Sequence, residues 1–440
     1  VLTGPAIGED YTHDECLSTP AATPDVVVVP TDAAQVAAVA AACDAEGVAL
    51  TARGSGTGLS GAAVARAGGV LLSFEAMAEN LENDTENHTP TVQPGVTLDQ
   101  LDRALEPLGL VYPVFPGENS ASLGGNVNTN AGGMRAVKYG VTRHNVLGLE
   151  AVLASGETIR TGGKIVKSSS GYDLTQLILG SEGTLALVTE ATLKVHPRLA
   201  HAATVLAPFT TLDEVTAAVP RIVDSGLGPM ILEYIDIITM AAMTAAEDLG
   251  LGIPDEIRES ALAYLVVVLE NADDERLDAD VAALGAQLID LGAVDVYVLP
   301  PQAATRIIEA REKAFWLAKA NGARDIVDIV VPRAAIPSFM REVERIGAET
   351  GSWIAGCGHA GDGNVHLGVF QDDPDLAKTV MAGLFTAARD LGGAISGEHG
   401  LGRAKRPYFL ELEDPAKIAL LRRIKTAFDP NGILNPGAMI

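Results

Sequence analysis

The sequence lacks an excess of basic residues. It carries 57 acidic against 31 basic residues, a net charge of −26. A protein that binds nucleic acid needs basic residues to neutralise phosphates, and an anionic membrane surface would repel this chain. The composition therefore argues against nucleic acid as a partner. A ligand that carries phosphates must be held locally, by backbone N–H groups.

Cysteine is scarce, and long apolar runs are absent. The three cysteines, Cys16, Cys43 and Cys357, form no C-x-x-C pair, which is typical of a reducing compartment. Residues 1–15 contain no basic and apolar leader pattern, and no apolar run reaches the length of a membrane span. We expect a cytoplasmic protein.

The opening of the chain predicts a β-α-β unit. A strand at Val26–Val29 precedes a helix from about Asp32 to Glu46, which Thr31 is expected to cap and Gly47 to end. Later patterns predict a capping box at Thr97–Gln100 and a hairpin of Val146–Ala154 and Glu157–Thr161 with its turn at Ser155-Gly156. The alternating residues Leu185–Val195 predict a half-buried strand ended by His196-Pro197. A second α+β part is expected to contain the strands Ile231–Ile235, Leu265–Leu269 and Val294–Leu299.

Glycine, with 46 residues, is clustered rather than scattered. Gly56-x-Gly58-x-x-Gly61 matches the dinucleotide fingerprint, but Gly68-Gly69 follows too soon for the helix that a Rossmann unit requires. No Lys-Ser/Thr follows, so it is not a P-loop. Either a plain turn or a nest of N–H groups for a pyrophosphate remains. Two further loops, Leu123–Gly133 and Leu179–Leu185, favour one large extended ligand.

Two late glycine clusters carry histidines. His359 and His366 stand seven apart across an Asp-Gly turn, a spacing that suits two strands folding back on each other. Glu398 can add a carboxylate, and two histidines with one carboxylate are a common transition-metal set. The alternative is a pair of hydrogen-bonded core histidines. Arg311, in a helical stretch with Phe315 and Trp316, is either a carboxylate clamp or part of a surface salt bridge.

Several motifs together resemble one family. They are Arg53-Gly-Ser-Gly-Thr-Gly-Leu-Ser-Gly61, Pro116-Gly117, Gly124–Gly133 with Lys138-Tyr-Gly140, Gly171-Tyr-Asp173 through Gly183, and the two late histidine clusters. They are similar to the FAD-binding oxidoreductases of the vanillyl-alcohol oxidase and p-cresol methylhydroxylase superfamily. Within it they are closest to the D-lactate dehydrogenase, glycolate oxidase large subunit and D-2-hydroxyglutarate dehydrogenase group.

The resemblance implies an α+β fold. It has a two-part FAD-binding domain of the p-cresol methylhydroxylase type and an α+β, ferredoxin-like cap. We assign residues 1–198 to the FAD-binding domain, 199–425 to the substrate or cap domain with the metal site, and 426–440 to a tail that returns to the flavin domain. Because residues 53–61 contain no His or Cys, we expect FAD to be bound without a covalent link.

The resemblance also implies roles for individual residues. His359, His366 and Glu398 would hold Zn or Mn, His399 would act as the base, and Arg311 would bind the substrate carboxylate. The expected FAD-binding residues are Arg53, Gly54, Ser55, Gly56, Thr57, Gly58, Ser60, Gly61, Pro116, Gly117, Ser122, Leu123, Gly124, Asn126, Thr129, Asn130, Gly132, Gly133, Tyr139, Gly140, Glu182, Gly183, Val188 and Asn435.

The expected activity is FAD-dependent oxidation of a small D-2-hydroxy acid such as D-lactate to the 2-oxo acid. Glycolate and D-2-hydroxyglutarate are alternative substrates, but the strand Asp325–Val331 lacks the lysine that the resemblance associates with a dicarboxylate. A non-redox flavoprotein transferase and a silent flavin-binding subunit are the rival functions. The sequence does not identify the electron acceptor: a quinone, a cytochrome, an electron-transfer flavoprotein and a partner iron–sulfur subunit are all open. Through this acceptor the protein could lie peripheral to a membrane. The sequence leaves a homodimer open.

Overall fold

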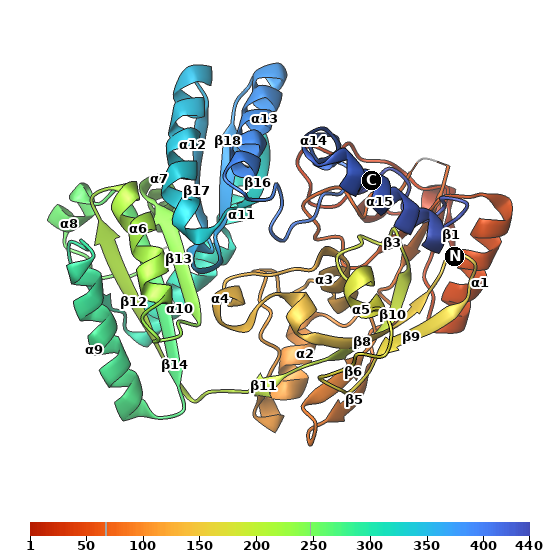
Figure 1. Cartoon of the computed structure of the whole chain (residues 1–440), viewed down its shortest axis with the longest axis horizontal. Helices are drawn as coiled ribbons and strands as arrows, with labels where there is room; N and C mark the ends of the chain where they lie inside the picture. The colour runs from red at the N-terminus through yellow and green to blue at the C-terminus, as the bar shows by residue number, and fades with distance from the viewer. Residues whose placement is uncertain (67, 247) are drawn as a thin grey trace. The chain divides into compact units, whose positions relative to one another are not determined.

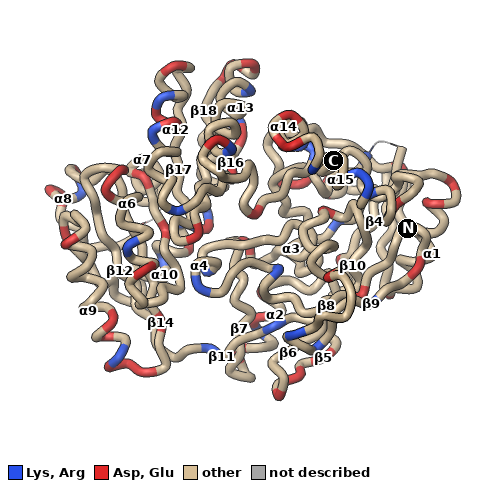
Figure 2. The backbone as a smooth tube through the Cα atoms, in the orientation of Figure 1, with Lys and Arg blue, Asp and Glu red and all other residues tan. Residues whose placement is uncertain are grey.

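The computed structural model describes residues 1–66, 68–246 and 248–440. The chain divides into two compact units. Figure 1 colours the chain by residue number, so that the segments of each unit can be followed. The first comprises Val1–Gly132, Gly140–Arg198 and Glu398–Ile440, and the second Gly133–Tyr139 and Leu199–Gly397. The compact units therefore differ from the domains proposed above, because residues 398–425 pack with the first unit. Figure 2 shows acidic residues distributed along both units.

The first unit contains two main sheets within its described residues. The mixed four-stranded sheet has the order β1 (Leu2–Thr3), β2 (Val26–Val28), β4 (Val70–Ser73) and β3 (Leu50–Arg53). The antiparallel five-stranded sheet has the order β5 (Asn80–Asp84), β6 (Thr89–Val92), β10 (Leu187–Leu193), β8 (Val146–Val152) and β9 (Thr158–Gly162). A two-stranded ladder joins β7 (Leu110–Val111) to β11 (His196–Pro197).

The helices of this unit begin and end much as their sequences predict. Helix α1 ends at Gly47, which adopts a left-handed conformation, but its cap is Asp32 rather than Thr31, because the Asp32 side chain accepts from Gln35 N. The Thr97 capping box is confirmed. The helices are α1 (Ala33–Glu46), α2 (Leu98–Leu105), α3 (Leu123–Thr129), α5 (Leu174–Ile178), α14 (Arg406–Leu412) and α15 (Pro415–Phe428).

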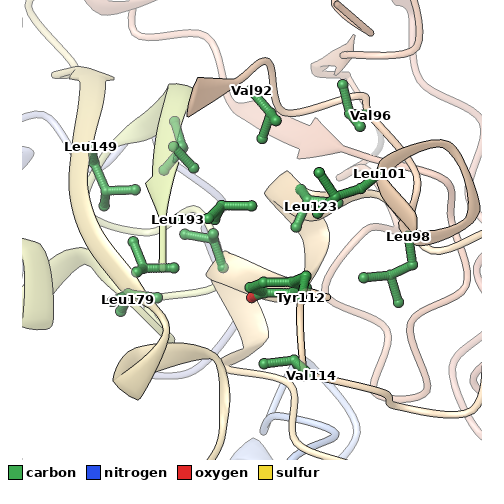
Figure 3. Close-up of a cluster of buried hydrophobic side chains, with 14 of the residues drawn as sticks. Val92, Val96, Leu98, Leu101, Tyr112, Val114, Leu123, Leu149, Leu179 and Leu193 are labelled. Carbon is green, nitrogen blue, oxygen red and sulfur yellow. The ribbon is translucent and has the colours of Figure 1, made fainter. Parts of the chain in front are cut away.

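Another local prediction was wrong. Residues 123–129 form the short helix α3 instead of a loop, because Ser122 caps it and Asn130 ends it in a left-handed conformation. The expected strand Leu185–Val195 is β10, which ends before His196-Pro197 as predicted, and these two residues form the separate strand β11. Figure 3 shows the core beneath the five-stranded sheet, where Leu123 of α3 packs beside Leu101 and Tyr112. This apolar packing explains how a glycine-rich segment can be held as a helix.

The second unit is built on an antiparallel sheet of seven strands, counted over its described residues. Their order is β15 (Tyr297–Val298), β12 (His201–Phe209), β14 (Ala263–Asn271), β13 (Ile231–Asp236), β17 (Trp353–Gly358), β18 (Asn364–Phe370) and β16 (Asp325–Val330). The expected strand Val294–Leu299 is reduced to the two residues of β15, which pair with Val205 and Leu206 in the middle of β12.

Helices cover both faces of this sheet. Helices α7 and α10 pack with the apolar residues of one face, and α6 and α9 pack on β12 and β14. Because both faces are covered, Ala263–Leu269 is buried at every position. The helices are α4 (Ala136–Tyr139), α6 (Leu212–Val223), α7 (Ile237–Ala246), α8 (Asp255–Ser260), α9 (Asp274–Asp290), α10 (Pro301–Glu312), α11 (Ala314–Ala320), α12 (Ile336–Thr350) and α13 (Pro374–Asp390).

Within the described part of the chain, no helix is both long and apolar enough to cross a bilayer.

Candidate FAD and metal sites

The first glycine loop runs from β3 to β4, and its described residues, 54–66 and 68–69, form no helix, as the sequence predicts. Gly56 and Gly61 adopt φ of +77°, a conformation that glycine allows. A Cβ at Gly54 would lie 2.0 Å from Ser122 Oγ, so this loop needs glycine to approach the start of α3. Residues 54–57 and Ser122 line a cavity of about 490 Å³. Backbone N–H groups around a cavity of this size fit a diphosphate.

Sequence reasoning missed the other wall of this cavity. Tyr11 and His13 line it, and His13 O accepts a 2.6 Å hydrogen bond from Arg53 Nη1. The buried Asp14 carboxylate accepts from Cys16 N at 3.1 Å. Burial raises the pKa of Asp14, against the attraction of Arg53. The only signal available was an isolated polar cluster, Tyr-Thr-His-Asp, before the first strand.

This neighbourhood sharpens the test for non-covalent FAD. Residues 53–61 offer no His or Cys, but His13 lines the same cavity. We expect acid denaturation followed by centrifugation to leave all the yellow colour in the supernatant. Colour that stays in the protein pellet would show a covalent link and make His13 the first residue to replace.

The other expected FAD-binding residues of the first unit meet at the second and third glycine segments. The Asn128 side chain bonds Gly124 O and Gly183 N, and Asn130 Oδ1 accepts from Arg143 N. Thr129 donates to Gly125 O. Asn126 and Val188 are buried, Pro116-Gly117 and Gly140 stand in loops, and Gly117 and Gly140 have positive φ. Tyr139 and Gly133 belong to the second unit, where the Tyr139 hydroxyl bonds Glu270 of β14.

Glu182 joins these segments to residues that follow Glu398. Its carboxylate accepts from Leu401 N at 2.6 Å and Gly402 N at 2.7 Å, and its C=O accepts from Asn435 Nδ2 at 2.8 Å. Burial raises the pKa of Glu182 to about 7, although both N–H groups act to lower it. Glu398 Oε2 accepts from Gly132 N at 3.0 Å. The expected metal ligand Glu398 thus also contacts an expected flavin segment.

In the second unit, the expected strand reversal brings His359 and His366 together. Strands β17 and β18 are adjacent and antiparallel (Figure 1). The two imidazole centroids lie 4.8 Å apart. Gly363 makes the turn with φ of +90°, where a Cβ would lie 2.1 Å from Val331 O. Two imidazoles this close can ligate one ion, and first-row transition metals favour such donors.

Glu233 of β13, which the sequence did not single out, organises this pair. It is 1% exposed, and its Oε1 lies 2.6 Å from His359 Nδ1. Its Oε2 lies 2.8 Å from Nε of Arg311, at the end of α10. Burial acts to raise the pKa of Glu233, but the charges of His359 and Arg311 outweigh burial and hold it below its usual value. With Nδ1 of His359 donating to this carboxylate, Nε2 is the nitrogen that a metal would take.

Asp328 of β16 is a second missed acid. It is fully buried, and its carboxylate accepts from Asn364 Nδ2, the Ser396 hydroxyl and Gly397 N at 2.7–3.0 Å. Asp328 Oδ1 lies 3.8 Å from His366 Nδ1. The aspartate therefore fixes Gly397, which is bonded covalently to Glu398. Each missed acid lies inside a largely apolar strand with one further aspartate at its end, Asp236 in β13 and Asp325 in β16, a pattern that by itself also fits solvent-facing positions.

A two-part flavin fold with a cap and a histidine pair defines an FAD-linked oxidase. Residues 24–162 match the family described as "FAD binding domain", and residues 198–439 match "FAD linked oxidases, C-terminal domain". The chain belongs to the FAD-linked oxidases of the vanillyl-alcohol oxidase and p-cresol methylhydroxylase superfamily.

The similar proteins include an uncharacterised FAD-linked oxidoreductase of Mycobacterium tuberculosis, 59% identical over 100% of this chain and 96% of the relative. A D-lactate dehydrogenase of Anaerostipes hadrus is 37% identical over 99% of this chain and 94% of the relative. A D-2-hydroxyglutarate dehydrogenase of Stutzerimonas stutzeri is 32% identical over 98% of this chain and 93% of the relative. Crystalline p-cresol methylhydroxylase aligns with a TM-score of 0.78 at 18% identity, over 98% and 91%, and confirms the fold.

Proposed function

We propose that this FAD-linked oxidoreductase is a D-2-hydroxyacid dehydrogenase that prefers D-lactate-like substrates. The observation that carries the proposal is the buried group of Glu233, His359 and Arg311, in which one carboxylate holds both an expected metal ligand and an expected substrate clamp. A 2-hydroxy acid presents a hydroxyl and a carboxylate on neighbouring carbons, so its hydroxyl can meet the metal while its carboxylate meets Arg311.

The residues divide the chemistry as follows. Arg311, held at Nε by Glu233, offers its Nη edge to the substrate carboxylate. His359, His366 and Glu398 would hold a divalent metal, Zn or Mn, which lowers the pKa of the substrate hydroxyl when bound. His399 takes the hydroxyl proton. Bound FAD supplies the acceptor for the hydrogen of C2.

Steady-state turnover by the isolated chain with an artificial electron acceptor tests this function. The amount of 2-oxo acid formed from a D-2-hydroxy acid should equal the amount of two-electron acceptor reduced. No turnover with any hydroxy acid would instead favour a silent flavin-binding subunit or a non-redox transferase.

D-2-Hydroxyglutarate is a second candidate substrate, favoured by one contact. Arg333 Nε donates to Gly361 O at 2.5 Å, within the turn that separates His359 from His366. A cation at this turn could pair with a second carboxylate. Values of kcat/KM for D-lactate and D-2-hydroxyglutarate with an artificial acceptor separate the two candidates.

Glu233→Gln provides a test of the buried group. The amide keeps one acceptor oxygen, but its NH₂ must face either His359 or Arg311, so one contact becomes repulsive. We expect metal affinity to fall about ten- to a hundredfold, with a higher KM. Metal titration and kinetics measure both, and Glu342→Gln on the exposed face of α12 is the control. Unchanged metal affinity and KM in Glu233→Gln would contradict this role.

A further inference from the structure

Glu182 lies where four segments of the first unit meet. Its carboxylate accepts from the adjacent N–H groups of Leu401 and Gly402 at 2.6 and 2.7 Å. Its own N–H donates to Asn128 O, and its C=O accepts from Asn435. The side chain is 5% exposed. Its acceptor oxygens thus point to the backbone of the segment that begins with Glu398 and His399.

The backbone of Glu182 is unusual for a residue with a side chain. Its φ is +52°, a left-handed conformation that favours glycine, and its neighbours Gly180 and Gly183 are glycines with φ of +74° and +68°. A Cβ at Gly400 would lie 2.6 Å from Glu182 Oε1. The segment is therefore shaped around this carboxylate. A glutamate at a position suited to glycine indicates that its side chain is needed.

Ser60 of the first glycine loop contacts the carbonyl groups of the same segment, residues 399–402. The Ser60 hydroxyl lies 2.9 Å from His399 O and 2.8 Å from Gly400 O, and Ser60 O accepts from Arg403 N. Ser60 and Glu182 together engage the carbonyl and N–H groups of residues 399–402. Both are also expected FAD-binding residues, and their side chains contact this segment.

We propose that Glu182 is a positioning residue, which holds residues 399–402 and so fixes the expected base His399 and metal ligand Glu398 at the flavin-binding loops. This inference rests on the proposed function for the roles of His399 and Glu398. It differs from a direct contact with FAD, because the effect of Glu182 passes through the backbone of Leu401 and Gly402.

Two variants separate these roles. Glu182→Gln keeps the shape but replaces one acceptor by a donor that faces an N–H group. Glu182→Gly relieves the positive φ and removes the carboxylate, so a loss of function there arises from the missing side chain. Glu157→Gln, on the exposed β8–β9 turn, is the control. We expect both Glu182 variants to lower kcat about ten- to a hundredfold, as a displaced catalytic group does, with the FAD Kd and KM close to wild type.

Hydrogen exchange gives a readout that does not depend on substrate. In the full-length holoprotein, the amides of Leu401 and Gly402 should exchange faster in Glu182→Gln than in wild type. If wild type is not reduced by any hydroxy acid but these amides lose protection, the proposed function fails and the positioning role stands. A higher FAD Kd with unchanged kcat at saturating FAD would overturn the inference. Unchanged kcat and unchanged exchange would overturn it as well. If neither Glu182 variant folds, Ser60→Ala tests the same segment, and unchanged kcat there would contradict the proposal.

Discussion

Replacement of His359 or His366 by alanine is expected to lower kcat by at least about a thousandfold, ~4 kcal/mol of transition-state stabilisation, as loss of a catalytic metal does. Each variant should lose metal while retaining FAD, since neither histidine belongs to the glycine segments expected to bind FAD. Elemental analysis should find near-stoichiometric metal in wild type and little in either variant. His201→Ala, an exposed histidine beside Asp274, is the matched control.

Glu398→Ala should lose activity and metal in the same way. Unlike the two histidine variants, Glu398→Ala should also weaken FAD binding. The Glu398 carboxylate accepts from Gly132 N, so its loss removes a contact with an expected flavin segment. The FAD content of this variant therefore needs its own measurement. Full activity in wild-type protein stripped of metal by a chelator would contradict the metal's role in all three cases.

The second large effect concerns substrate choice. We expect kcat/KM for D-lactate to exceed that for D-2-hydroxyglutarate by about a hundredfold, which corresponds to ~2.8 kcal/mol. Arg311 and the metal engage the carboxylate that all candidates share, so discrimination must arise at the far end of the pocket. A second carboxylate buried there without a cation carries a desolvation cost.

The structure refines which cations could reach that carboxylate. Strand β16 carries no lysine, and its Asp328 is committed to Asn364, Ser396 and Gly397. Lys319 lies over the Trp316 ring, 5.0 Å from its centroid. Arg333, at Gly361 O, is therefore the cation to test.

A panel of D-lactate, D-2-hydroxybutyrate, glycolate and D-2-hydroxyglutarate with an artificial acceptor measures the preference. Arg333→Gln should change the value for D-lactate little, and Arg341→Gln, an exposed partner of Asp213, is the control. If D-2-hydroxyglutarate were the best substrate and Arg333→Gln abolished that preference, the argument from the missing lysine would be wrong.

Much of the fold followed from local signals in the sequence. Gly47 and the Thr97 capping box mark helix ends through contacts within a few residues, and the Ser155-Gly156 turn sets its hairpin. The histidine pair was predictable because a seven-residue spacing across a glycine turn has few structural solutions.

What escaped prediction depends on contacts between distant residues. Glu233 reaches His359 across 126 positions, and Glu182 reaches Gly402 across 220. Nothing near Glu233 in sequence marks it as different from a solvent-facing residue. Glu182 lies in a glycine segment that the sequence did single out, but for FAD and not for the backbone of Leu401 and Gly402. The helix at 123–129 was missed because its glycines disfavour a helix locally, and its cap and the packing of Leu123 decide its structure.

Anaerobic mixing of the purified holoprotein with D- and L-2-hydroxy acids, followed by flavin absorbance, tests the central claim most directly. The proposed function predicts that D-lactate bleaches the oxidised flavin band rapidly and fully, and that L-lactate does not. Bleaching by the L enantiomer alone, or an unchanged flavin spectrum with every hydroxy acid, would contradict it.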